Sequence, residues 1–443
     1  MKMNPRLALI GAAVAIAGLA LAGCSSTATT ATKGWTIPTK DPKATITVLS
    51  AFGLDAAGGG DMQPVLDAFA KAHPTIKVKW ELASNNDLDS ALSSRLGNKD
   101  ASLDLFWADQ PTIGALALRG YVEDLTKQFA PYKSAWEKSA YDGSSFEGKL
   151  YGVPTGTSTQ LLYYNKGLLS AAGITPPSAD PTAPTSWEDL ANLGKQAQAK
   201  GGAKYGLTLA QANAYYQLEP LPVSLGGSAG GTGKGNLTPD VASDPWVKAM
   251  TFYASLFADK VAPRGTVDNG ADFLAGKTAF IVNGSWMIDQ LVGQTKVDWG
   301  VAPSPKFADG KAVTPTGSWD VAMSPYSKNK AAASIFLKWL TVDNGGNISR
   351  YRAAPDLPAN NAGLKLYLEK PVFTTPVGQD AAKILAYQAA NTGVPRLETV
   401  GYDEFQTIIG KTFSDIANGA DPKTALDAAN VALKSAWAKY STQ

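Results

Sequence analysis

The chain has 443 residues, of which 44% are hydrophobic, and its formal net charge is +2. This length supplies enough apolar material for two hydrophobic cores. The near-neutral charge argues against nucleic-acid binding, because such binding draws most of its affinity from neutralising phosphates.

The first residues predict a secretion signal that is removed. Lys2 and Arg6 precede an apolar run over residues 7–21. This run is shorter than the roughly 20 residues that a membrane span needs. Residues 21–24, Leu-Ala-Gly-Cys, resemble a bacterial lipobox, in which cleavage precedes the cysteine and its sulfur receives a diacylglycerol. Removal of residues 1–23 leaves 38 basic and 38 acidic residues.

Cys24 is the only cysteine, so we expect it to be the lipid anchor; the alternative is a chance cysteine in a plain secretion signal. The Ser/Thr-rich stretch that follows, up to residue 43, lacks apolar periodicity and predicts a flexible tether.

From residue 44 the pattern is α/β. Strands are predicted over residues 45–49, 76–82 and 103–107, with helices between them, which indicates a parallel sheet with right-handed crossovers. Ligands of such sheets bind beyond the carboxyl ends of the strands. Phe52 and Asp55 after the first strand, and Trp107 and Asp109 at the third, are therefore site candidates.

Residues 148–169 interrupt this pattern. A short strand broken by Pro154 and Gly156 resumes at residues 160–164 before a turn into a helix. These residues alone fit two interpretations about equally well, a hinge between two lobes and a β-hairpin within one.

A resemblance favours the hinge. GKLYGVP followed by YYNK resembles the signature of extracellular solute-binding proteins of ABC importers, in the sugar-binding class (family 1). DFLAGKTAFIVNGSWMI, starting at Asp272, and GVPRLETVGYDEF, starting at Gly393, are similar to later motifs of that family. The resemblance implies a two-lobed periplasmic-binding-protein-like α/β fold, in which each lobe is a mainly parallel sheet flanked by helices and a hinge joins the lobes.

Few residues could carry catalysis or bind metal. His73 is the only histidine and, with Cys24 as the lipid anchor, we expect no catalytic residues, no metal and no cofactor. Tyr163 and Tyr164 would suit a ferric-ion site, but neighbouring strand residues point to opposite faces, so we favour packing.

Aromatic and polar residues remain, and sugar sites pair aromatic platforms with carboxylate, amide and guanidinium groups. Tryptophans can equally fill cores, which is what we expect of Trp80, Trp339 and Trp437. The candidate ligand-binding residues are Phe52, Asp55, Trp107, Asp109, Tyr215, Asn283, Trp286, Trp319, Asp320 and Arg396, with Tyr216 as a further wall.

The sequence thus predicts a lipid-anchored, extracellular, monomeric receptor that captures a mono- or oligosaccharide between two lobes and presents it to an ABC importer permease. The alternatives are a surface-anchored glycoside hydrolase and a peptide-binding receptor. The expected parts are a signal peptide (residues 1–23), a lipidated tether (24–43), lobe 1 (44–155 and 315–360) and lobe 2 (156–314 and 361–443).

Overall fold

The computed structural model describes residues 35–440 except 56–60, 84, 266–268 and 354–355. The expected signal peptide, Cys24 and most of the tether lie outside this range. Within it, no helix is long and apolar enough to cross a membrane.

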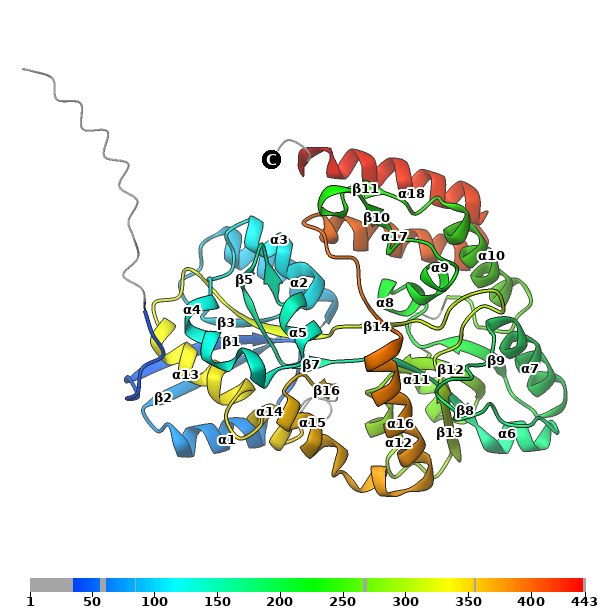
Figure 1. Cartoon of the computed structure of the whole chain (residues 1–443), viewed down its shortest axis with the longest axis horizontal. Helices are drawn as coiled ribbons and strands as arrows, with labels where there is room; N and C mark the ends of the chain where they lie inside the picture. The colour runs from blue at the N-terminus through cyan, green and yellow to red at the C-terminus, as the bar shows by residue number, and fades with distance from the viewer. Residues whose placement is uncertain (1–34, 56–60, 84, 266–268, 354–355, 441–443) are drawn as a thin grey trace, which may run out of the picture. The chain divides into compact units, whose positions relative to one another are not determined.

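The first lobe, in which Figure 1 labels β1, β2 and β3, is built on a five-stranded sheet of order β2-β1-β3-β15-β6. Strand β1 pairs in parallel with β2 and β3, while β15 runs antiparallel to both β3 and β6. The sheet therefore joins early strands to one that arrives much later in the chain. The bounds are β1 Ala44–Ser50, β2 Ile76–Leu82, β3 Leu105–Asp109, β6 Gly152–Pro154 and β15 Trp319–Met323.

The second lobe is built on a four-stranded sheet of order β13-β8-β12-β9. Only the pair β9 and β12 is parallel; β8 is antiparallel to both of its neighbours. The two-lobed α/β fold is as expected, and each sheet is mainly parallel, with one reversed strand, β15 in the first sheet and β8 in the second. Strands that enter a sheet from the other lobe do not arrive through the helical crossover that enforces parallel pairing. The bounds are β8 Gln160–Asn165, β9 Tyr205–Leu209, β12 Thr278–Gly284 and β13 Trp299–Pro303.

The chain passes between the sheets three times, from β6 to β8, from β13 to β15, and from helix α13 (Lys330–Thr341) to helix α16 (Pro376–Asn391). Short strands accompany these passages. β7 (Gly156–Thr157) pairs with β16 (Leu357–Pro358), and β14 (Thr314–Thr316) pairs with β17 (Gly393–Pro395). Segments distant in sequence are thus bound to one another where the chain changes lobe.

Helices cover both sheets. In the first lobe α1 (Gln63–Ala72) packs on β2 and α13 on β1 and β15. In the second, α7 (Trp187–Lys200) packs on β9 and β12, and α16 on β13. Helices α10 (Asp244–Ala258), α17 (Tyr402–Ala417) and α18 (Pro422–Trp437) pack on one another. The remaining α-helices are α2 Asn85–Gly97, α3 Ile113–Leu118, α4 Thr126–Phe129, α5 Lys138–Gly143, α6 Lys166–Ala171, α8 Tyr215–Leu218, α9 Pro220–Ser224, α11 Gly270–Leu274, α12 Met287–Leu291, α14 Asn347–Arg350 and α15 Asn361–Leu368. Two small hairpins pair β4 Ser145–Phe146 with β5 Lys149–Leu150 and β10 Gly231–Thr232 with β11 Thr238–Pro239.

The second sheet separates two buried clusters. Tyr164 contributes to the cluster that holds Trp187 and Trp437, while Tyr163 contributes to the cluster on the other face, with Trp299. The two tyrosines therefore point to opposite faces and do not form a shared iron site.

Candidate functional site

Arg396 forms the most deeply buried charged contact between the described parts of the two lobes. It follows β17, and its Nη1 and Nη2 atoms donate to Asp109 Oδ2 and Oδ1 at 2.7 and 2.5 Å. Asp109 ends β3 in the first lobe. Burial, the largest single cause, lowers the pKa of Arg396, but the charge and hydrogen bonds of Asp109 together with the nearby Tyr402 and Glu219 raise that pKa above its ordinary value. Two parallel bonds between planar groups fix distance and orientation together.

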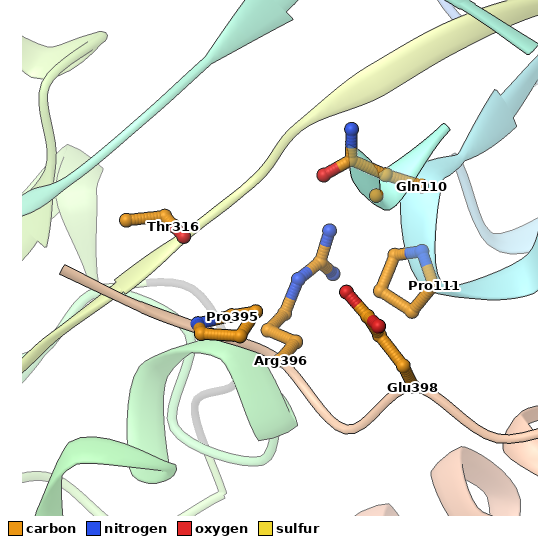
Figure 2. Close-up of a pocket in the computed structure, with 7 residues that line it drawn as sticks. Gln110, Pro111, Thr316, Pro395, Arg396 and Glu398 are labelled. Carbon is orange, nitrogen blue, oxygen red and sulfur yellow. The ribbon is translucent and has the colours of Figure 1, made fainter. Parts of the chain in front are cut away.

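A small cavity lies beside this ion pair. Its volume is about 10 Å³, room for roughly one water molecule. Figure 2 shows Arg396 reaching from its own segment toward Gln110 and Pro111, which follow Asp109 in the first lobe. Thr316, from the second passage between lobes, lies at the same cavity. The site is therefore assembled from both lobes and from a crossing segment.

An aromatic pair adjoins the guanidinium in the second lobe. The plane of Tyr216 lies under Arg396 at 5.6 Å, and the ring of Trp286 lies 5.5 Å from that of Tyr216. Gly284, at the end of β12, makes room for Trp286: a Cβ atom there would come within 2.0 Å of the indole. The Tyr216 hydroxyl lies 3.0 Å from Ser158 Oγ, which donates to Gly317 O, so both crossing segments help to position it.

The first lobe contributes a second aromatic group. Half-buried Trp319, at the start of β15, meets Phe52 edge-on at 5.8 Å, and Phe52 meets Trp107 at 6.0 Å. Trp319 O accepts bonds from both the backbone and the hydroxyl of Thr155. Trp319 is thereby tied to the first passage between lobes.

Three acidic side chains near the ion pair have raised pKa values. Burial raises the pKa of Asp320 to about 8, and the charge of Asp109 adds to this; its Oδ1 accepts from Ser144 and its Oδ2 has no partner. Burial also raises the pKa of Glu219 to about 8. Desolvation raises that of Asp356, whose partner is Ser318, to about 6. Burial thus shifts all three of these carboxyl groups towards their neutral form.

The structure separates the predicted site residues into three groups. In the first group, Asp109 and Arg396 form the ion pair, and Trp286 and Trp319 lie near it. In the second, Phe52 packs on Trp319, and buried Asp320 lies within range of the charge of Asp109. Asp55 lies exposed in the loop after β1.

The third group, Trp107, Tyr215 and Asn283, is buried inside the lobes, and ligand contact by these residues stays a prediction. Trp107 packs between Phe52 and Trp80. The Tyr215 hydroxyl bonds Glu219 and Ala229 O, and its ring packs on Phe405. Asn283, in β12, contacts Met287 at the start of α12 through its side-chain amide nitrogen, and its side-chain oxygen accepts from the amide of Gly284.

The sequence interpretation gave no role to Gln110 and Ser158 and ranked Tyr216 below Tyr215. Gln110 follows Asp109 directly, and Tyr216 follows Tyr215, so the sequence indicated these two residues only through their adjacency to predicted site residues. Which of two adjacent tyrosines faces the ion pair depends on how α8 sits on the sheet, which no local pattern specifies.

Comparison with known proteins identifies the fold's relatives. The family model "Bacterial extracellular solute-binding protein" matches residues 54–345, about two thirds of the chain. The chain is 25% identical over 380 residues to a mannitol-binding protein of Pseudomonas aeruginosa, covering 81% of this chain and 85% of that one. It is 28% identical over 353 residues to the maltodextrin-binding protein MdxE of Bacillus subtilis, with 76% and 78% covered.

A third relative is a maltooligosaccharide ABC transporter solute-binding lipoprotein of Streptococcus pneumoniae, 26% identical over 296 residues, with 64% and 66% covered. Among solved structures, a substrate-binding protein of Listeria monocytogenes in complex with cycloalternan superposes with a TM-score of 0.77 at 22% identity. That alignment covers 89% of this chain and 99% of the other. At this identity the likeness establishes the two-lobed fold.

Proposed function

The chain belongs to the bacterial extracellular solute-binding protein family, and from that premise we propose that it captures a carbohydrate between its two lobes and delivers it to the permease of an ABC importer. The protein is a binding protein and not an enzyme, in keeping with that family. The observation that carries the proposal is the Asp109–Arg396 ion pair, which joins the lobes beside aromatic side chains from each.

This arrangement suits sugar chemistry. Sugars present apolar C–H faces and rings of hydroxyl groups, so they combine stacking on indoles with hydrogen bonds to charged groups. Trp319 in the first lobe and Trp286 in the second supply aromatic surface, and Asp109 and Arg396 supply acceptors and donors. The relatives named for mannitol, maltodextrin and maltooligosaccharide point to the same ligand class.

The competing functions fit less well. The glycoside hydrolase alternative is not supported, because the matched family and relatives are binding proteins. A peptide-binding receptor would pair ligand backbone with an exposed strand edge, whereas here aromatic side chains flank the ion pair.

We also propose the domain boundaries and hinge given by the sequence, with lobe 1 at residues 44–155 and 315–360, lobe 2 at 156–314 and 361–443, and bending at the three crossings. The receptor acts as a monomer on the outer face of the cell membrane.

Cys24 is proposed to carry the lipid that holds the receptor there. Its place after Leu-Ala-Gly motivates this, and the streptococcal relative is named as a lipoprotein. We expect Cys24→Ala to move the protein from the membrane fraction to the medium with unchanged sugar affinity. An unlipidated Cys24 in mass spectra of the membrane-bound protein would refute the anchor.

The binding function is tested by calorimetry of the purified protein against polyols, monosaccharides and oligosaccharides of two to six units. We expect at least one to bind with micromolar or tighter affinity. If none binds while a peptide or amino-acid panel does, the carbohydrate proposal is wrong.

A further inference from the structure

We propose that the Asp109–Arg396 pair makes this receptor selective for uncharged sugars over sugars that carry a carboxylate, and that Asp109 is the residue that sets this selectivity. The inference rests on the proposed function and concerns which carbohydrates the same site accepts.

The guanidinium of Arg396 is already committed. Its two terminal nitrogens hold both oxygens of Asp109, and its side chain is only 7% exposed. One face of the group lies over Tyr216. A guanidinium recognises a carboxylate through this same two-point geometry. A uronic acid could therefore make this two-point contact with Arg396 only by displacing Asp109.

A displaced Asp109 would have no comparable partner among the groups around it. The charge of Asp109 already adds to desolvation, the larger cause, in raising the pKa of Asp320 to about 8 and that of Asp356 to about 6. Asp89 keeps exposed surface, but crowding by protein atoms and then the charges of Asp109 and Asp403 raise its pKa to about 6. The smaller, electrostatic part of these shifts means that each of the three carboxyl groups lies within range of the negative charge of Asp109.

The positive charges nearby do not offset a further anion. Arg119 is bound to Asp403 at 2.7 Å, and Arg396 to Asp109. A ligand carboxylate would add one negative charge beside Asp109, in a region where burial already disfavours the ionised form of carboxyl groups. Breaking a buried ion pair and leaving one member unpaired is strongly unfavourable.

An uncharged sugar meets no such obstacle. Its hydroxyl groups can accept from the remaining guanidinium hydrogens and donate to the outer lone pairs of Asp109 while the ion pair stays intact. Its apolar face can lie on Trp286 or Trp319. The site therefore accepts hydroxyl groups and rejects carboxylates.

The experiment measures calorimetric affinities for matched probes at pH 7.5. The matched neutral and anionic probes are glucose and glucuronic acid, galactose and galacturonic acid, and galactobiose and digalacturonic acid; maltose and maltotriose serve as further neutral probes. Methyl esters of the acids keep their shape without the charge. For the wild-type protein we expect the best neutral probe to bind at least about 100-fold more tightly than its acid, with the ester within about tenfold of the neutral sugar.

Asp109→Asn frees the guanidinium while nearly preserving shape, so we expect the gap between acid and neutral sugar to shrink to about tenfold or less, through tighter acid binding. The control is Asp259→Asn, which removes a carboxylate from an exposed pair with Lys195 and should leave the ratio unchanged.

Wild-type protein that binds acid and neutral probes equally would overturn the selectivity but not the carbohydrate function. Absence of binding by every probe, acids included, would count against both. An ester as weak as its acid would show that shape, not charge, excludes uronic acids; this readout needs no variant.

Discussion

Trp286 and Trp319 are the two candidate tryptophans that keep exposed surface near the Arg396 ion pair, one in each lobe. Stacking on an aromatic ring contributes about 1–3 kcal/mol, on the nearest measured scale. We expect Trp286→Ala and Trp319→Ala each to weaken sugar binding by about ten- to a hundredfold, measured by calorimetry. Tyr351→Ala, at a 37% exposed aromatic that packs on Trp339, is the control and should bind normally. Normal binding by both tryptophan variants would remove these residues from the site.

Asp320 makes stability depend on pH. Its pKa is about 8 in the folded protein, because of burial, against an ordinary value of 3.8. Between these values the folded state binds more protons than the unfolded state. The contribution of Asp320 to the free energy of unfolding is therefore fully present below about pH 4 and is lost as the pH rises through about 8. The slope is at most about 1.4 kcal/mol per pH unit.

Asp320→Asn keeps the shape without the titration. Its melting temperature should therefore fall less than that of the wild type between pH 5 and pH 8.5 in thermal unfolding. Parallel curves for the two proteins would mean that Asp320 is ionised throughout.

For single residues, the sequence predicted which side chains lie near the site better than it predicted which of them are buried. Trp286, Trp319, Asp109 and Arg396 were identified because aromatic and polar residues adjoin strand ends and family-like motifs. Burial was not predictable, since Trp107 follows the same local rule as Trp319 and yet is enclosed by Phe52 and Trp80.

Among the elements, β12 and the turn after it position the second lobe's indole. The ring of Trp286 folds back over Gly284, where a Cβ atom would lie 2.0–2.3 Å from three ring atoms. Gly284→Ala should therefore displace Trp286, at a cost of about 1–3 kcal/mol in stability, and weaken sugar binding about as much as Trp286→Ala.

The matched control is Gly410→Ala in α17, where the added Cβ would meet only an ordinary contact at 3.5 Å. That variant should bind normally and unfold at the same temperature or slightly above it. If Gly284→Ala also binds normally, the position of Trp286 does not matter for the ligand.

Most elements followed from apolar periodicity. The stripe Leu426, Ala429, Leu433 and Trp437 is buried as α18 requires, and the strand over residues 76–82 has the predicted bounds. The residue that caps a helix was harder to predict, because adjacent residues can be equally suited to the cap position. Thr185 and Glu188 have the spacing of a capping box, which predicts the cap at Thr185. In the structure the cap of α7 is Ser186, whose hydroxyl donates to Asp189 Oδ2 and accepts from the Asp189 amide. The mainly parallel sheets were predicted, but the reversal of β8 and β15 was not, because their pairing partners lie far apart in the chain.

In the whole molecule, two ion pairs join the lobes within the described range. Asp109–Arg396 is buried, whereas Arg119–Asp403 is about one third exposed and is therefore the weaker of the two. A hinge needs such contacts to be breakable, because closure on a ligand is useful only if the empty receptor can open. A sugar that touches both lobes binds the closed form better, and that difference alone drives closure.

Small-angle scattering tests this closure. We expect the radius of gyration of the wild-type protein to fall when its sugar is added, with the sugar recovered unchanged. Arg396→Ala removes the buried pair, so the sugar-free variant should have a larger radius than the sugar-free wild type. Asp403→Ala breaks only the exposed pair and should give a smaller increase. A radius that is identical in all three proteins, with and without sugar, would show that the lobes do not move, and the receptor would then have to signal its bound state to a permease through the ligand itself.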